Sequence, residues 1–169
     1  MDERSRTYGS ISSTGMSADG AAPRAVDPEI SRRMRRIQAK NTSPEVTTRR
    51  ILHSSGFRFR LHRRDLPGTP DIVLPRLRVA VFVNGCFWHQ HSGCRLARPP
   101  KANPGYWVPK FQRIAARDRT AADRLESLGW HVLVVWECET RRPDQLSARL
   151  SRCLYALSKE RSRKDRGQQ

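Results

Sequence analysis

The sequence predicts an α/β fold in which helices flank a mixed four-stranded sheet. Three short segments rich in Val, Ile and Phe follow one another at residues 57–61, 71–74 and 78–83. A long amphipathic helical pattern separates them from a fourth apolar segment at residues 130–136. Three neighbouring strands followed by a helical crossover to a fourth strand are typical of a sheet with helices on both faces.

The strands differ in how completely we expect them to be buried. Apolar and basic residues alternate from Phe57 to His62, which predicts a half-exposed strand with its basic face outward. The strands at 71–74 and 78–83 are joined through Pro75-Arg76-Leu77, and residues 130–136 read as a buried strand. Residues 84–108 contain many Gly and Pro residues, which predicts an irregular segment.

Four helices are expected. One starts at Asp27-Pro28-Glu29, and a second starts at Ser43-Pro44-Glu45 with a capping serine and proline at its first position. The second helix should end near Gly56. The remaining two span residues 109–128 and 144–158, each with an apolar stripe.

Composition divides the chain into one domain with two tails. Residues 1–26 are rich in Ser, Gly and Ala without hydrophobic periodicity, and residues 159–169 are polar and basic. Both segments are expected to be disordered. Residues 27–158 then form a single domain, since one core serves chains of up to roughly 250 residues.

The charge of the chain points to a polyanionic partner. There are 33 Lys and Arg residues against 16 Asp and Glu residues, which gives a formal net charge of +17. Nucleic acid is the first candidate. The alternative is that the arginine excess reflects codon usage in a GC-rich genome and only aids solubility.

We expect a cytoplasmic protein without a membrane anchor. No apolar run approaches the roughly 20 residues of a spanning helix, and the first residues lack the apolar segment of a secretory signal. In the cytosol, four cysteines favour metal binding or free thiols over disulfides.

Three potential zinc ligands lie within one short loop: Cys86, His91 and Cys94. Cys138 follows the strand at 130–136 and is the candidate for the fourth ligand. Four protein ligands would close the shell and make the ion structural. The alternative is a group of ordinary buried cysteines with a chance histidine. Of the other Cys and His residues, we assign one to the helical core and three to the surface: Cys153, and His53, His62 and His131.

A second, open metal site is indicated by carboxylates. Asp71 follows a turn-forming run and begins a strand, and Mg²⁺ prefers oxygen ligands of this kind. Asp118 lies on the apolar stripe of the helix at 109–128, where an unpaired charge would be costly. The alternative for Asp118 is a structural ion pair with Arg117 or Arg119.

Several motifs together resemble one known family, the very short patch repair (Vsr) DNA mismatch endonucleases. The resemblance covers about residues 30–140, and its most specific run is Gly85-Cys86-Phe87-Trp88-His89. The other motifs are Pro44-Glu45, Leu66-Pro67-Gly68-Thr69-Pro70-Asp71, Arg117-Asp118-Arg119, Leu128-Gly129-Trp130 and Val135-Trp136-Glu137-Cys138.

The resemblance implies a restriction-endonuclease-like core, catalytic magnesium, structural zinc, and nicking of one strand at T:G mismatches that arise when 5-methylcytosine deaminates. It implies that Asp71 and the backbone carbonyl of Val83 hold magnesium and that His89 is the general acid or base. Asp118 would pair with His89, and Glu45 would support the water shell of the metal. Asn84 departs from the family, which has a further histidine there; its polar side chain is a candidate for orienting a phosphate.

DNA contacts are expected from aromatic and basic side chains. Phe87 and Trp88 are candidate wedges between base pairs, and the resemblance adds Trp107. The alternative is that all three pack against the zinc loop. The helix at residues 27–40 is a candidate clamp on DNA phosphates, through Arg32, Arg33, Arg36 and Lys40. The alternative is a plain solvated helix.

We therefore expect a magnesium-dependent DNA endonuclease that nicks at T:G mismatches and carries zinc. A restriction-type nuclease acting on matched DNA and a non-catalytic, zinc-stabilised nucleic-acid-binding module are the alternatives. We expect a monomer, associated with the nucleoid, with mismatch-repair proteins and a cytosine methyltransferase as functional partners.

Overall fold

The computed structural model describes residues 40–166, and residues 1–39 and 167–169 lie outside the described part. The expected N-terminal tail, the helix from Asp27, and Arg32, Arg33 and Arg36 therefore fall outside it. The described helices are α2 (Ser43–Ser54), α3 (Pro104–Ser127) and α4 (Pro143–Arg166). The strands are β1 (Arg60–Leu61), β2 (Ile72–Leu74), β3 (Val79–Asn84) and β4 (His131–Trp136), with 3-10 turns η1 (Pro75–Leu77), η2 (Arg95–Ala97) and η3 (Glu139–Arg141).

The four strands form one mixed sheet in the order β1-β2-β3-β4. β1, β2 and β3 pair antiparallel, and β4 pairs with β3 in parallel after the crossover through α3. The predicted meander and crossover are thereby confirmed. In the parallel pair Asn84 lies opposite Trp136, so the loops that follow β3 and β4 leave the sheet side by side.

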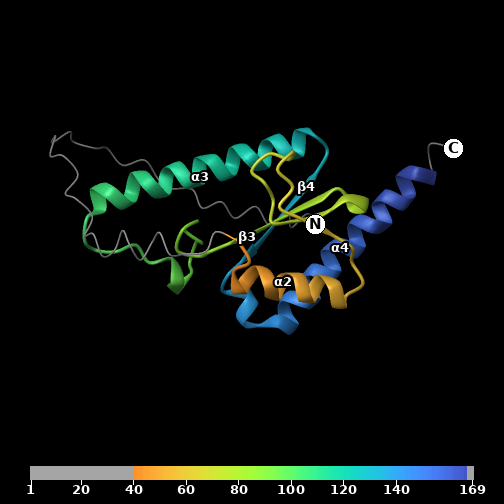
Figure 1. Ribbon diagram of the computed structural model, residues 1–169, viewed down its shortest axis with the longest axis horizontal. Helices are drawn as coiled ribbons and strands as arrows, with labels where there is room; N and C mark the ends of the chain where they lie inside the picture. The colour runs from red at the N-terminus through yellow and green to blue at the C-terminus, as the bar shows by residue number, and fades with distance from the viewer. Residues whose placement is uncertain (1–39, 167–169) are drawn as a thin grey trace.

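Helices cover both faces of the sheet, with α2 and α4 on one side and α3 on the other (Figure 1). Side chains alternate between two cores along each strand, as the pleat requires. Val79 and Val81 pack with α2 and α4, whereas Ala80 packs with Leu125 of α3. Strands buried on both faces explain why the sequence of β2 and β3 is almost continuously apolar.

The turn before β2 is held close to α3. Gly68 has a φ of +74°, and a Cβ built there would lie 2.7 Å from Cβ of Ala121. Glycine therefore allows both the left-handed backbone and the close approach. This packing fixes the segment that places Asp71 directly before the first residue of β2.

Several helix boundaries differ from those predicted. The cap of α2 is Thr42, not Ser43, and its hydroxyl accepts a hydrogen bond from the backbone N of Glu45. α3 begins at Pro104, with Asn103 as its cap, so Pro109 lies inside the helix. Pro109 is exposed in the second turn, near the helix start, and the signal missed was the pair Asn103-Pro104.

The predictions for the C-terminal helix and for the two edge strands also differ from the structure. α4 continues to Arg166, so the predicted boundary at Ser158 is too early and residues 159–166 are helical. β4 is an edge strand in which only Val135 is fully buried, and β1 contains only two residues. None of the helices in the described residues is long and apolar enough to cross a membrane.

Candidate active site and neighbouring metal cluster

The loops after β3 and β4 bring together the four side chains predicted to bind zinc: Cys86, His91, Cys94 and Cys138. Their ligand atoms lie within 4.8 Å of one another, and none of the cysteines is in a disulfide. Nδ1 of His91 is 3.6 Å from Sγ of Cys86 and 3.3 Å from Sγ of Cys138. Three sulfurs and one nitrogen in a closed group can hold a tetrahedral metal ion.

The surroundings of this cluster fix its ligands. The His91 ring stacks on Trp136, with ring centroids 4.2 Å apart and planes at 3°. The backbone N of Cys86 donates to Oε2 of Glu137 at 3.3 Å. Burial raises the pKa of the Cys86 thiol to about 12, so without a metal this sulfur keeps its proton. A bound cation would reverse that preference, because thiolates are the ligating form.

A second group lies where β1, β2 and α2 meet. The candidate ligand atoms of Glu45, His62 and Asp71 are within 4.8 Å of one another. Asp71 precedes β2, and its Oδ2 accepts a hydrogen bond of 2.7 Å from the backbone N of Val83 in β3. Burial raises the pKa of Asp71, the Val83 hydrogen bond lowers it, and the nearby charge of Glu45 raises it again. A divalent cation would relieve the cost of that buried charge.

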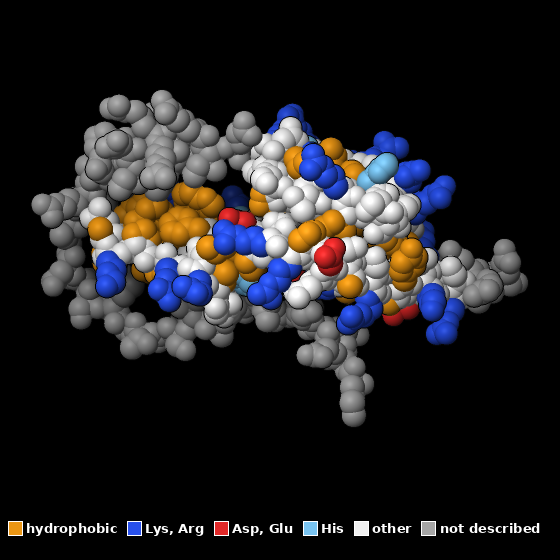
Figure 2. Space-filling model, turned by 90° about the horizontal axis from the view of Figure 1, so that it is seen from below, with side chains coloured by type: hydrophobic (Ala, Val, Ile, Leu, Met, Phe, Trp, Pro, Cys, Tyr) orange, Lys and Arg blue, Asp and Glu red, His pale blue; other side chains and the backbone are white. Residues whose placement is uncertain are grey.

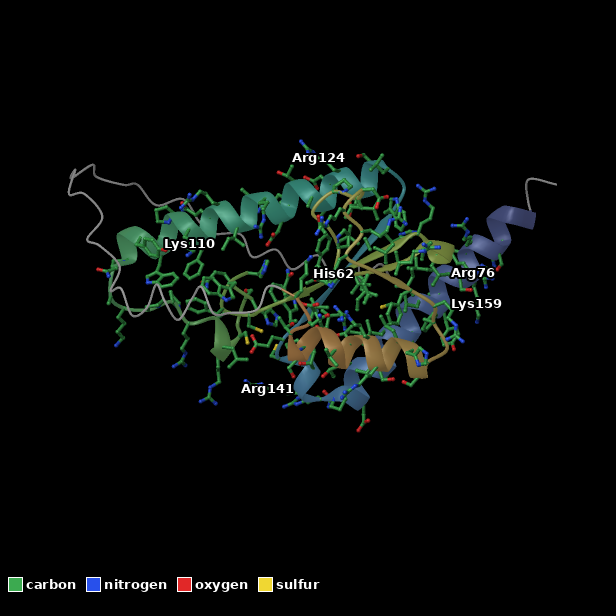
Figure 3. The ribbon with its side chains drawn as sticks, viewed as in Figure 1. His62, Arg76, Lys110, Arg124, Arg141 and Lys159 are labelled. Carbon is green, nitrogen blue, oxygen red and sulfur yellow. The ribbon has the colours of Figure 1, made fainter. Side chains whose placement is uncertain are left out.

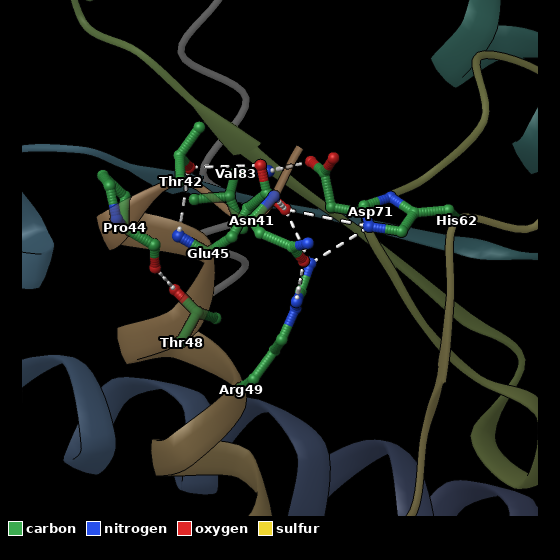
Figure 4. Close-up of polar contacts among 9 residues, drawn as sticks. All are labelled: Asn41, Thr42, Pro44, Glu45, Thr48, Arg49, His62, Asp71 and Val83. Atoms are coloured by element: carbon green, nitrogen blue, oxygen red, sulfur yellow. Dashed lines mark hydrogen bonds and ion pairs between the residues drawn. The ribbon is translucent and has the colours of Figure 1, made fainter. Parts of the chain in front are cut away.

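Glu45 reaches this group from the first turn of α2 and is only 3% exposed. Its Oε1 accepts from the Thr42 hydroxyl at 3.1 Å. Its Oε2 accepts from the backbone N of Asn41 at 3.0 Å and from Nη2 of Arg49 at 2.7 Å (Figure 4). These three donors hold the Glu45 carboxylate in place inside the protein, next to Asp71.

His62 was predicted to lie on the surface, and this prediction was wrong. The side chain is 19% exposed and Nε2 lies 4.0 Å from Oε2 of Glu45. In Figure 3, His62 lies near the centre of the molecule, while the labelled arginine and lysine side chains lie farther out. The alternation of the strand ends before His62, because its φ of 47° turns the chain and its backbone N donates to O of Asp71.

His89 and Asp118 form a pair between the β3 loop and α3. Nδ1 of His89 contacts Oδ2 of Asp118, and the other carboxylate oxygen accepts from Arg117 at 3.2 Å. Both interpretations of Asp118 are therefore realised, the histidine partner and the arginine partner. The backbone N of His89 also donates to O of Gly85, one turn beyond β3. Asn84, the last residue of β3, is buried, with 6% of its surface exposed.

The three predicted wedge residues belong to one aromatic cluster. Phe87 makes edge contacts with Trp88 and Trp107, with ring centroids 5.0 and 5.4 Å apart. Trp107 is only 5% exposed, whereas Phe87 and Trp88 are half-buried. Nζ of Lys110 lies 5.2 Å from the centre of the Trp88 ring. Of the three, Trp88 and Phe87 are therefore the more accessible to a ligand.

Basic side chains are spread over the face of the molecule seen in Figure 2, with few acidic ones between them. Lys40, the described member of the predicted clamp, is exposed. An open pocket of about 880 Å³ lies beside Cys94 and Cys138 and was not anticipated from the sequence. Its lining includes five arginines from η2, η3, the residues directly after these turns, and α4, which no local motif brings together: Arg95, Arg98, Arg141, Arg142 and Arg149.

Sequence comparisons define the class of the protein. Residues 26–95 match the family described as DNA mismatch endonuclease Vsr. A type II nicking enzyme, V.XorIIP of Xanthomonas oryzae pv. oryzae, is 51% identical over 72% of this chain and 88% of its own length. A second, V.NmeAIP of Neisseria meningitidis, is 40% identical over 73% of this chain and 88% of its own length.

These matches identify the protein as a DNA endonuclease. The DNA mismatch endonuclease Vsr of Escherichia coli is 38% identical over 69% of this chain and 74% of its own length. The chain belongs to the DNA mismatch endonuclease Vsr family. Membership sets aside the alternative of a non-catalytic binding module.

Proposed function

We propose that the protein is a magnesium-dependent endonuclease that nicks one DNA strand at T:G mismatches. The proposal includes a restriction-endonuclease-like core and structural zinc in the Cys/His cluster. The observation that carries the proposal is the hydrogen bond that places Asp71 against Val83 of β3. The loop that contains His89 follows the same strand. This placement supports a site at the end of β3 in which Asp71 is the proposed metal-binding carboxylate and His89 the proposed proton-transfer group.

The residues of the site divide the work of phosphodiester hydrolysis. Asp71 and the backbone carbonyl of Val83 would hold magnesium, which when bound acidifies water and neutralises charge on the phosphate. His89 moves the proton through Nε2, because Asp118 engages Nδ1 and holds the ring. Glu45 orders water near the metal. Asn84, the last residue of β3, is the candidate for orienting a phosphate with its polar side chain.

The Cys/His cluster contributes rigidity instead of chemistry. Cys86 and His91 flank Phe87, Trp88 and His89, so a metal that fixes the two ligands also fixes the loop between them. Zinc fits a group of three sulfurs and one nitrogen with no open position. The loop then presents His89 to the phosphate with little conformational freedom.

Mismatch recognition is proposed to depend on the aromatic cluster. Hydrophobic side chains gather at the end of the molecule where the N-terminal half of α3 lies (Figure 2). An aromatic side chain inserted into a duplex must unstack base pairs, which costs a few kcal/mol and least at a weakened pair. Trp88 lies beside Lys110, so one site combines stacking with a charge for phosphate.

The test is a nicking assay on end-labelled duplexes that differ at one base pair. With Mg²⁺, the T:G duplex should be nicked at least about tenfold faster than the T:A and C:G duplexes, a difference of about 1.4 kcal/mol. Omitting Mg²⁺ should abolish nicking of all three. Equal rates on the three duplexes would instead favour a restriction-type nuclease for matched DNA.

A further inference from the structure

Arg49 joins the carboxylate group from one helical turn beyond Glu45. Its Nη2 lies 2.7 Å from Oε2 of Glu45 and 3.1 Å from Nε2 of His62. Its Nη1 donates to Oδ1 of Asn41 at 2.7 Å, and the side chain is 14% exposed. The guanidinium is therefore held in place by three different residues (Figure 4).

These contacts define the hydrogen-bonding role of Nε2 of His62. A guanidinium has only donors, so Nε2 of His62 is the acceptor in its contact with Arg49. An unprotonated imidazole nitrogen and a carboxylate oxygen are both metal-ligating atoms. Here the two atoms are 4.0 Å apart and share one cation, the Arg49 guanidinium.

The charges of the group limit how many cations it can accommodate. Asp71 and Glu45 are the two carboxylates of the cluster, and Arg49 already compensates one of them. One divalent ion on Asp71 leaves a single excess positive charge, which matches one phosphodiester. A second divalent ion beside Arg49 would meet a like charge in a poorly solvated site.

We propose that Arg49 occupies a second cation position of the catalytic centre as a fixed positive charge. The protein then binds one divalent ion, on Asp71, and Glu45 with His62 forms a latent metal site that opens when the charge is removed. The proposal rests on the proposed function, since it concerns the cations of the same centre. It assigns to Arg49 the electrostatic role that a second metal ion has in two-metal nucleases.

The experiment counts Mn²⁺ bound to zinc-loaded protein by electron paramagnetic resonance, without DNA and without activity. Thiolate sites prefer zinc to Mn²⁺, so the Cys/His cluster stays loaded with zinc. The wild type should bind one Mn²⁺ and Arg49→Met two. Arg49→Lys keeps the charge and should bind one, and Arg49→Met with His62→Ala should return to one.

Arg50→Met is the matched control, because Arg50 is an exposed neighbour on the same helix. It should bind one Mn²⁺, like the wild type. Thermal unfolding checks that each variant folds. Arg49→Gln is the second neutral variant, because it keeps a hydrogen-bond donor for Glu45 but lacks the charge. Added Mn²⁺ should raise the unfolding temperature of the neutral variants more than that of the wild type.

The possible failures are distinguishable. Two ions in the wild type, or one ion in both folded neutral variants, would overturn the role of Arg49 and leave the proposed nuclease intact. No Mn²⁺ in the wild type, or an unchanged count in Asp71→Asn, would overturn the metal site on Asp71 and this proposal with it. A count of two Mn²⁺ ions in the wild type would by itself overturn the role of Arg49, and this measurement does not depend on the folding of any variant.

Discussion

Two ligand clusters lie near the same end of the sheet, and they differ in almost every chemical respect. The Cys/His cluster has four soft or borderline ligands, three of them from one loop. The carboxylate cluster has two hard oxygen ligands and one imidazole, contributed by α2, the end of β1 and the start of β2. The first arrangement is suited to holding a metal permanently, and the second leaves room for water and substrate.

The difference shows how one sheet end supports both rigidity and reactivity. A closed metal shell ties together the loops after β3 and β4, where Asn84 and Trp136 are paired. The carboxylate cluster does not need a closed metal shell to fix its ligands, because the backbone N of Val83 already positions Asp71. We therefore expect mutations in the carboxylate cluster to lower mainly activity and mutations in the Cys/His cluster to lower mainly stability.

The largest expected effect is on activity. Asp71→Asn should lower the nicking rate by about 10²- to 10³-fold or more, which is typical when one group that stabilises transition-state charge is lost. DNA affinity should change little, since the basic surface remains. Rates are measured in single turnover, with Asp65→Asn as the control because Asp65 is an exposed carboxylate paired with Arg63. A rate near that of the wild type would contradict the assignment of Asp71.

The complementary effect is on stability. Cys138→Ser removes one ligand of the closed cluster and should lower the free energy of unfolding by about 4 kcal/mol or more, as expected for loss of a structural metal. Cys153→Ser is the matched control, since Cys153 is half-buried on α4 outside the cluster. Zinc content and denaturant unfolding are measured for both proteins. Equal zinc content in the two would refute the ligand assignment.

The sequence was most informative where a pattern is local. Short segments rich in Val, Ile and Phe predicted the sheet, and the density of Cys86, His91 and Cys94 predicted the Cys/His cluster. Asp118 was found because a charge on an apolar helix face needs a partner. Cys138 could be added because parallel strands bring their ends together, as β3 and β4 do.

The sequence was least informative where one dihedral angle or one distant contact decides the outcome. His62 continues an alternating pattern, and only its positive φ turns it toward Glu45. Arg49 is one of many arginines, although its spacing of four residues from Glu45 is a recognisable helical ion-pair signal. The basic pocket combines arginines from η2, η3 and α4, which no sequence period relates.

A smaller effect is expected in the aromatic cluster that the Cys/His loop presents. Trp88→Ala should weaken binding to T:G DNA by about 1–3 kcal/mol, the range of base–aromatic stacking, and weaken binding to matched DNA less. Trp130→Ala is the control. Trp130 lies directly before the first residue of β4, at the end of the strand away from the Cys/His cluster, and its ring lies beneath Arg78. Affinities are measured in Ca²⁺ to separate binding from cleavage. An equal loss on both duplexes would make Trp88 a packing residue.

The smallest effect separates the two clusters by their response to pH. Burial raises the pKa of Asp71 above its ordinary value of about 3.9. Without magnesium, the folded state therefore holds this proton more tightly than the unfolded chain does. The resulting stabilisation is fully present below the ordinary Asp pKa and is lost as the pH rises through the raised one. The Cys/His cluster has the opposite dependence, because acid protonates its ligands and releases the metal.

Denaturant unfolding of the wild type and Asp71→Asn in magnesium-free buffer isolates this contribution. The two proteins should be most similar at the acidic end of the window, and the wild type should lose stability relative to Asp71→Asn as the pH rises. Loss of zinc in acid affects both proteins alike and cancels in the difference. Added Mg²⁺ should reduce the difference at the upper end, because the cation compensates the charge that Asn lacks. A difference that stays constant with pH would show that Asp71 titrates in the folded protein as it does in the unfolded chain.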